Sequence, residues 1–99
     1  MFVVVSRFTV IDGLAADVRS AFLARPHRVD QAPGFKRMEV LTPQGSPEEF
    51  WLMTWWQDES AFDAWHRSPE YHESHRHLPK GLKLVPGSSE IRRFDLIAE

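Results

Sequence analysis

The spacing of apolar side chains changes several times along the chain, and each change predicts a new element of secondary structure. Residues 2–10 (FVVVSRFTV) are mostly β-branched or aromatic, which is typical of a strand, and the turn signal Asp12–Gly13 ends it. From Leu14 onward the apolar positions follow a helical spacing, at Val18, Phe22 and Val29. Because Pro26 has no amide hydrogen to donate, we expect this first helix to be long but interrupted.

Two strands that form a hairpin are expected next. The segment APGF (32–35) predicts a break between elements. Residues 35–43 predict a second strand that stops at Pro43. Residues 49–57 (EFWLMTWWQ) predict a third strand. The connection between the two is short and contains Gly-Ser-Pro, so we expect them to be antiparallel neighbours.

Two short helices and a closing strand complete the pattern. Asp58 is suited to cap a helix whose apolar stripe is formed by Ala61, Phe62 and Trp65. The pair Ser68–Pro69 is a second helix start and predicts a helix over residues 69–76. Residues 78–87 are expected to form an irregular loop, and residues 89–98 the last strand.

The order β-α-β-β-α-β predicts a single α+β domain over residues 1–99, with a ferredoxin-like antiparallel sheet. The third strand is apolar on both faces, since side chains alternate along a strand. One face carries Phe50, Leu52, Thr54 and Trp56, and the other carries Trp51, Met53 and Trp55. Helices cover only one face of such a sheet, so we expect a second copy of the chain to cover the other, as a homodimer.

Composition and charge narrow the possible partners. A net charge of −2, with basic residues that do not cluster into a stripe, argues against nucleic acid as a partner. The chain has no cysteine, which excludes a disulfide framework and a thiolate nucleophile and fits a reducing compartment. The apolar start MFVVV meets Arg7 too soon for a signal peptide or a membrane span. We therefore expect a soluble, cytoplasmic protein without a membrane partner.

Several short motifs resemble those of the antibiotic biosynthesis monooxygenase (ABM) superfamily. They are PGF before the second strand, TWWQDESAFDAW from the third strand into the helix, and the following S…Y..SH, in the same order of elements. The resemblance spans nearly the whole chain and implies a dimeric α+β barrel with monooxygenase activity. Within the superfamily, Trp65 and His75, ten residues apart, are most similar to the haem-degrading monooxygenases of the IsdG type.

The resemblance implies a role for three residues. His75 would be the axial ligand of haem iron, Trp65 would line the distal pocket, and both would bind the cofactor. Ser6 falls where these enzymes carry an asparagine near the oxygen side, so Ser6 is the third candidate. Serine is shorter than asparagine and offers no amide donor to bound oxygen. This difference from the family pattern therefore concerns haem cleavage more than haem binding.

The residues taken alone allow other interpretations. His75 can instead be a solvated histidine near a helix end. If an imidazole does bind iron, His77 is the nearest substitute ligand. His72 and His75 form an i,i+3 pair, which by itself is weak support for a metal site. Trp65 can be a core residue, and Ser6 a hydrogen-bonded core serine. Lys80 and Lys83 either meet ligand carboxylates or are solvated.

Three functions therefore remain open. The first is a homodimeric haem-binding protein that degrades haem, with haem as both cofactor and substrate. The second is a monooxygenase without cofactor that acts on a quinol or polycyclic aromatic in a dry aromatic cavity. The third is a dimeric binding module without catalysis. The first two functions imply haem or a small aromatic molecule as the ligand, whereas in the third the aromatic side chains belong to the core.

Overall fold

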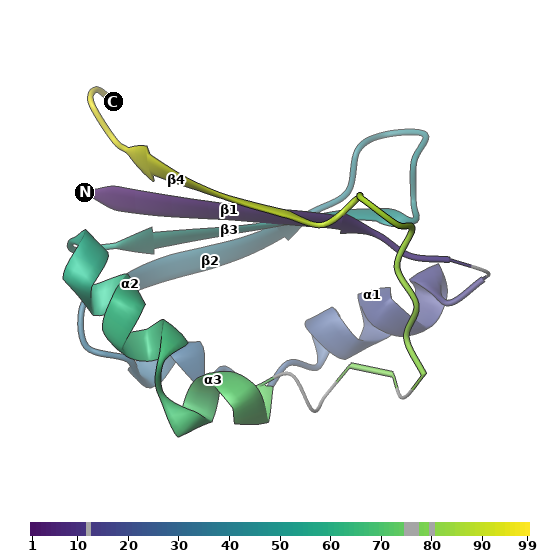
Figure 1. Cartoon of the computed structure of the whole chain (residues 1–99), viewed down its shortest axis with the longest axis horizontal. Coiled ribbons are helices and arrows are strands. Elements are labelled where there is room, and N and C mark those ends of the chain that lie inside the picture. Colours follow the sequence, from purple (N-terminus) through teal and green to yellow (C-terminus); the bar gives the residue numbers. More distant parts are fainter. Residues whose placement is uncertain (12, 75–77, 80) are drawn as a thin grey trace.

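The computed structural model describes residues 1–11, 13–74, 78–79 and 81–99, and within them three α-helices lie on one face of a four-stranded antiparallel sheet (Figure 1). In chain order the elements are β1 (Phe2–Thr9), α1 (Ala15–Leu23), the 3₁₀ helix η1 (Val29–Gln31), β2 (Phe35–Leu41), β3 (Glu49–Trp56), α2 (Glu59–His66), α3 (Pro69–Ser74) and β4 (Glu90–Asp95). The strand order is β2-β3-β1-β4. The predicted α+β class, the β-α-β-β-α-β order and the ferredoxin-like sheet are confirmed.

The interruption of the first helix is also confirmed. Helix α1 ends at Leu23, ahead of Pro26, and the chain resumes as η1. Between them His27 has a φ of 56°, in the left-handed region that few residues other than glycine adopt. Val29, expected on the face of the first helix, lies in η1 instead, where it is buried.

Local signals position the two later helices. Asp58 caps α2, since its side chain accepts a hydrogen bond of 2.9 Å from the amide of Ala61. Ser68 accepts a hydrogen bond of 3.3 Å from the amide of Tyr71 at the start of α3. Helix α3 is described as far as Ser74, and the expected continuation to residue 76 lies outside the described residues. The closing strand β4 is shorter than the expected 89–98.

A bulge sets the register of β2. Phe35 pairs with Trp56 and Arg37 pairs with the next residue of β3, Trp55, so the strand carries one extra residue. Phe35 and Met38 therefore both pack toward the helices, although strict alternation would separate them. The start of β2 also lies close against α2, because a Cβ on Gly34 would meet the Cβ of Ala61 at 2.6 Å.

The helix-facing side of the sheet carries the core. Of the two sets on β3, Phe50 and Trp56 are buried under the helices, with Trp56 fully enclosed. The core forms two clusters, one around Trp56, Phe62 and Trp65, and the other around Val18 and Phe50. Members of both clusters also line a cavity between the sheet and the helices.

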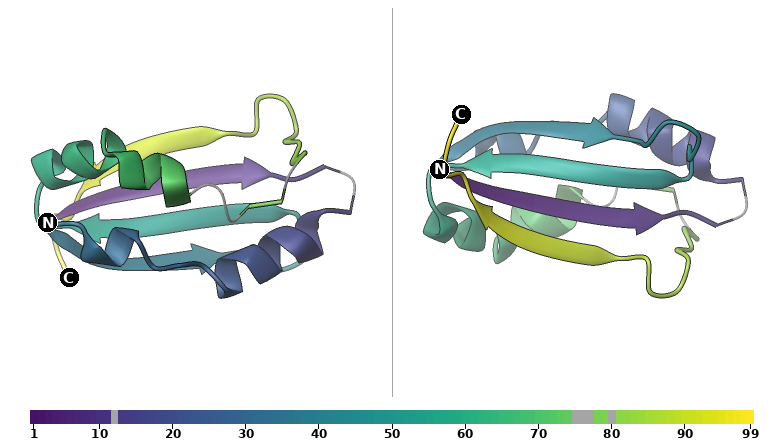
Figure 2. Two further views of the ribbon diagram at one scale, coloured as in Figure 1. Left: turned by 90° about the horizontal axis from the view of Figure 1, so that it is seen from below. Right: turned by 90° about the horizontal axis from the view of Figure 1, so that it is seen from above.

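The opposite side of the sheet is bare in the single chain (Figure 2). It carries the other β3 set, Trp51, Met53 and Trp55, which are partly exposed, and Phe94 of β4, which is 40% exposed. Arginines stack on these rings: Arg7 on Trp51 at 5.6 Å, Arg37 on Trp55 at 4.1 Å and Arg92 on Phe94 at 5.2 Å. We call this side of the sheet the open face.

Candidate functional site

A cavity of about 340 Å³ lies between the sheet and the helices, and we call it the central cavity. Side chains of β1 and β3 form its ceiling: Val4, Ser6, Phe8, Leu52, Thr54 and Trp56. Its other walls come from the helices and the loop after α3, including Phe22, Phe62, Trp65, His66, Tyr71, Leu78, Leu82 and Leu84. The lining is mostly apolar, with a few polar groups, as is typical of small-molecule sites.

Ser6 reaches the central cavity from the middle of β1. In the sheet it lies between Leu52 of β3 and Ile91 of β4, both of which also line the cavity. Among the described residues nothing forms a hydrogen bond with its hydroxyl. Of the two roles considered from the sequence, the position of Ser6 in the cavity lining agrees with a pocket group.

Trp65 is both a core residue and a cavity wall. It is only 9% exposed and packs in the cluster with Trp56 and Phe62, as its helical stripe predicts. Its ring also meets Tyr71 edge-on, with centroids 6.2 Å apart. The fold therefore brings Ser6 and Trp65 to one cavity, from β1 and α2 respectively.

The histidine-rich stretch is described only in part. His75 and His77, the candidate iron ligand and its substitute, lie outside the described residues, as does Lys80. Ser74 and Leu78, which precede and follow this gap, both line the central cavity. His72 is exposed and does not line the cavity. Among the described residues no three His, Cys, Asp or Glu side chains are grouped as metal ligands.

Among the described residues, the cationic side chains that line the cavity are those of two arginines that the sequence pattern did not mark. Arg25 and Arg28 line it from the segment between α1 and η1, whereas Lys83 is exposed and does not. Arg25 pairs with Asp30 at 3.0 Å, but within the described part of the chain Arg28 has no ion pair. The interruption at Pro26 is the one sequence signal that marks this segment.

The Asp30 carboxylate anchors the segment. His27 pairs with it at 3.2 Å, opposite the Arg25 contact. Burial disfavours ionisation of Asp30, but the hydrogen bonds from Arg25 and His27 outweigh it and lower the pKa of this carboxyl. The ion pair between Arg25 and Asp30 is therefore charged on both sides at neutral pH, and it ties the segment after α1 to η1.

His66 and Tyr71 are two further polar residues of the cavity lining that the sequence pattern did not mark. Their rings lie 4.6 Å apart, and His66 also stacks on Phe62 at 5.5 Å. Burial raises the pKa of the Tyr71 hydroxyl, so it stays protonated at neutral pH. Tyr71 belongs to the S…Y..SH motif, which offered a signal, whereas His66 is marked only by following Phe62 at helical spacing.

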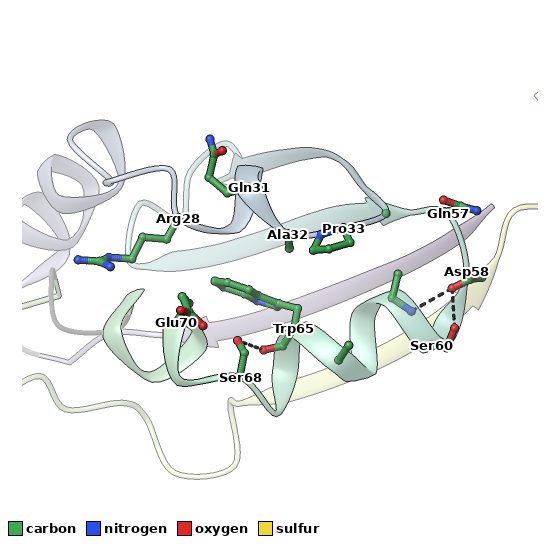
Figure 3. Close-up of a pocket in the computed structure, with 13 residues that line it drawn as sticks. Arg28, Gln31, Ala32, Pro33, Gln57, Asp58, Ser60, Trp65, Ser68 and Glu70 are labelled. Atoms are coloured by element: carbon green, nitrogen blue, oxygen red, sulfur yellow. Dashed lines mark hydrogen bonds between the residues drawn. The ribbon is translucent and has the colours of Figure 1, made fainter.

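A second depression, the side groove, lies between α2 and the η1–β2 connection (Figure 3). It measures about 480 Å³ and is more polar, with Gln31, Gln57, Asp58, Ser60, Ser68 and Glu70 among its lining residues. Trp65 extends from α2 toward Ala32, and both Trp65 and Arg28 line the groove as well as the central cavity. They form the boundary between the two.

The family model of antibiotic biosynthesis monooxygenases matches residues 1–77. The chain belongs to this family. Among its curated relatives, a staphylobilin-producing haem oxygenase of Staphylococcus haemolyticus is 33% identical over 81% of this chain and 78% of its own. A mycobilin-producing haem oxygenase of Mycobacterium tuberculosis is 30% identical over 88% of this chain and 80% of its own.

Solved structures of the ABM family share the fold. The haem degrader MhuD of Mycobacterium tuberculosis, with two haems in its active site, superposes with a TM-score of 0.80 at 22% identity, covering 100% of this chain and 98% of that one. SnoaB, a cofactor-independent oxygenase of Streptomyces nogalater, superposes with a TM-score of 0.78 at 24% identity, covering 99% of this chain and 94% of that one.

Within the described residues, no helix is long and apolar enough to cross a membrane.

Proposed function

We propose that this ABM-family protein binds haem in the central cavity and degrades it as a monooxygenase. The observation that carries the proposal is that Ser6 and Trp65, two of the three positions implied by the family resemblance, line one mostly apolar cavity. The curated relatives that are 30–33% identical to it are haem oxygenases, which supports the same reading.

The described lining suits a flat, apolar macrocycle that carries carboxylates. Trp65 and Phe62 supply aromatic surface, and Arg28 supplies a cation without an ion pair among the described residues. Such a cation favours a ligand carboxylate at the edge of the cavity. Bound haem would supply the iron for oxygen chemistry and would itself be the molecule cleaved, with electrons from an external donor.

We propose His75 as the iron ligand on the basis of the family resemblance. The support for His75 is its ten-residue distance from Trp65, together with the lining positions of Ser74 and Leu78 around it. We further propose a homodimer that covers the open face and a cytoplasmic location, where reduced electron donors are available.

A haemin titration followed by visible spectroscopy tests the proposal. We expect a Soret band that saturates at a single ratio of haem to protein. His75→Ala should shift or abolish this band, because a neutral imidazole is a good iron ligand. His72→Ala is the matched control, since His72 is exposed and lines no part of the cavity, and it should change the band little. Equal loss in both variants would mean non-specific binding to the histidine-rich surface.

Ser6 favours a second candidate function, oxidation of a quinol or polycyclic aromatic without cofactor. At this position the IsdG-type enzymes carry an asparagine, and here a hydroxyl enters an apolar cavity instead. The fold shared with SnoaB is compatible with this alternative. Oxidation of a quinol by protein that gives no Soret band with haemin would select it over haem degradation.

A further inference from the structure

Two residues of β3 form a hydrogen bond in the ceiling of the central cavity. The indole N–H of Trp56 donates to the hydroxyl oxygen of Thr54 at 2.9 Å. The two residues are two positions apart, so their side chains lie on the same, helix-facing side of the strand. Trp56 is fully buried, which keeps water from competing for this hydrogen bond.

The bond leaves Thr54 with its own hydrogen to donate. A threonine hydroxyl has one O–H and two lone pairs, and the Trp56 indole occupies one of the lone pairs. Among the described residues no acceptor receives the O–H of Thr54, and its side chain lines the cavity. The donor is thus available to a molecule inside the cavity.

Resting on the second candidate function above, oxidation of a quinol or polycyclic aromatic in the central cavity, we infer that Thr54 donates a hydrogen bond to an oxygen atom of the bound aromatic ligand. Trp56 is the positioning residue, because its donation turns the hydroxyl hydrogen away from itself. Ser6, on the neighbouring strand, lacks such a partner among the described residues and can rotate between donor and acceptor. Thr54 therefore selects ligands that present an acceptor oxygen, such as a ketone, quinone or phenolate.

Two probes of similar shape separate this contact from general packing. Naphthalene fills an aromatic site without offering an acceptor, and 1,4-naphthoquinone adds two carbonyl oxygens. We expect Thr54→Val to weaken binding of the quinone about three- to tenfold, as for one neutral hydrogen bond, and to leave naphthalene within about twofold. Thr54→Ser keeps the hydroxyl and should restore the preference for the quinone.

Trp56→Phe tests the positioning role in the same assay. It removes the indole donor, so the Thr54 hydroxyl can turn, and the ratio of quinone to naphthalene affinity should fall part of the way. Because Thr54→Val leaves the indole N–H buried without its acceptor, this variant will be less stable. The double variant Thr54→Val/Trp56→Phe removes both partners and provides the same comparison if the single variant does not fold.

The outcomes distinguish this inference from the proposed function. Equal weakening of both probes, or an unchanged ratio, overturns the role of Thr54 while leaving the cavity as a binding site. Failure of both probes to bind, together with no Soret band from haemin, overturns the cavity and the Thr54 contact together. A quinone preference that Thr54→Val abolishes, in protein that still binds naphthalene, supports it.

Discussion

The close approach between the start of β2 and helix α2 depends on Gly34, which has only a hydrogen atom in place of a side chain. Its φ of +83° is strained for other residues, and a Cβ there would lie 2.6 Å from the Cβ of Ala61 on α2. Its carbonyl also accepts a hydrogen bond of 2.8 Å from the amide of Gln57. The side groove is bordered by this contact, so its width depends on the absence of a side chain at residue 34.

We expect Gly34→Ala to destabilise the protein more than Gly45→Ala. Both positions have a φ near +84°, so both variants incur the same backbone strain of about 1–2 kcal/mol, but nothing lies within 4 Å of a Cβ on Gly45. The steric clash at residue 34 should add about 1–3 kcal/mol, measured by urea denaturation. Equal losses in the two variants would show that α2 shifts to accommodate the methyl group.

At the scale of single elements, helix α2 depends on its N-cap residue as well as on its apolar stripe. Asp58 accepts hydrogen bonds from the amide of Ala61 and the hydroxyl of Ser60, and these lower the pKa of its carboxyl. At the other face of the helix, Arg93 of β4 reaches Glu59 at 2.8 Å and Asp63 at 2.9 Å. The helix that carries Trp65 is thus fixed at its start and along one side.

Asp58→Ala should lower the melting temperature by about 4–8 °C at neutral pH, as for the loss of one helix cap in a domain of this size. Since the pKa is lowered in the folded state, the contribution is complete above the ordinary carboxyl value of about 3.9 and is lost as the pH falls through the folded value. Calorimetry should therefore show the gap between wild type and variant closing below pH 4.

Asp58→Asn is the matched control for this prediction. Asparagine also caps helices well but does not titrate, so this variant should melt near the wild type at neutral pH and lose less stability in acid. If Asp58→Asn melts as early as Asp58→Ala, the charge and not the cap provides the stabilisation.

Local chemistry made much of the fold predictable, and tertiary geometry explains what was missed. The caps at Asp58 and Ser68 and the break before Pro26 depend on neighbours in sequence, and all three are present. The bulge between Phe35 and Arg37 depends on the register with β3, which no pattern within β2 reveals.

The candidate site likewise contains residues that the sequence marks and residues that only the tertiary structure reveals. The periodicity of α2 marked Trp65, and the family resemblance marked Ser6. Arg28 reaches the cavity only through the direction that the chain takes after α1, and the availability of the Thr54 donor depends on a hydrogen bond with Trp56. Neither follows from residue spacing. The assignment of His75 stays a prediction.

At the scale of the whole molecule, we expect a partner to cover the open face. Its tryptophans are partly exposed, and the stacked Arg7 and Arg37 shield them only in part. Monomeric proteins rarely leave such a surface in water, and two sheets of this kind can pack face to face. A second copy of the chain is the occupant that we propose.

Met53→Glu is the sharpest test of the homodimer. Met53 lies between the two tryptophans and opposite Glu39 in register, whereas a carboxylate at Trp51 or Trp55 would meet the arginine that stacks there. Burying the new charge should weaken the dimer at least about hundredfold, as measured by sedimentation. Leu23→Glu, at a position 80% exposed on α1, is the control and should leave the association state unchanged. A monomeric wild type would remove the argument for a partner.

The strand order also sets a time at which the cavity can first exist. β1 is synthesised before the other strands, yet its two neighbours in the sheet are β3 and β4, and Phe2 pairs with Asp95. During translation both edges of β1 stay unpaired until the segments that leave the ribosome later have emerged. Contacts so distant in sequence also slow folding. We therefore expect the cavity, and with it the proposed ligand site, to form only after nearly all of these residues have emerged.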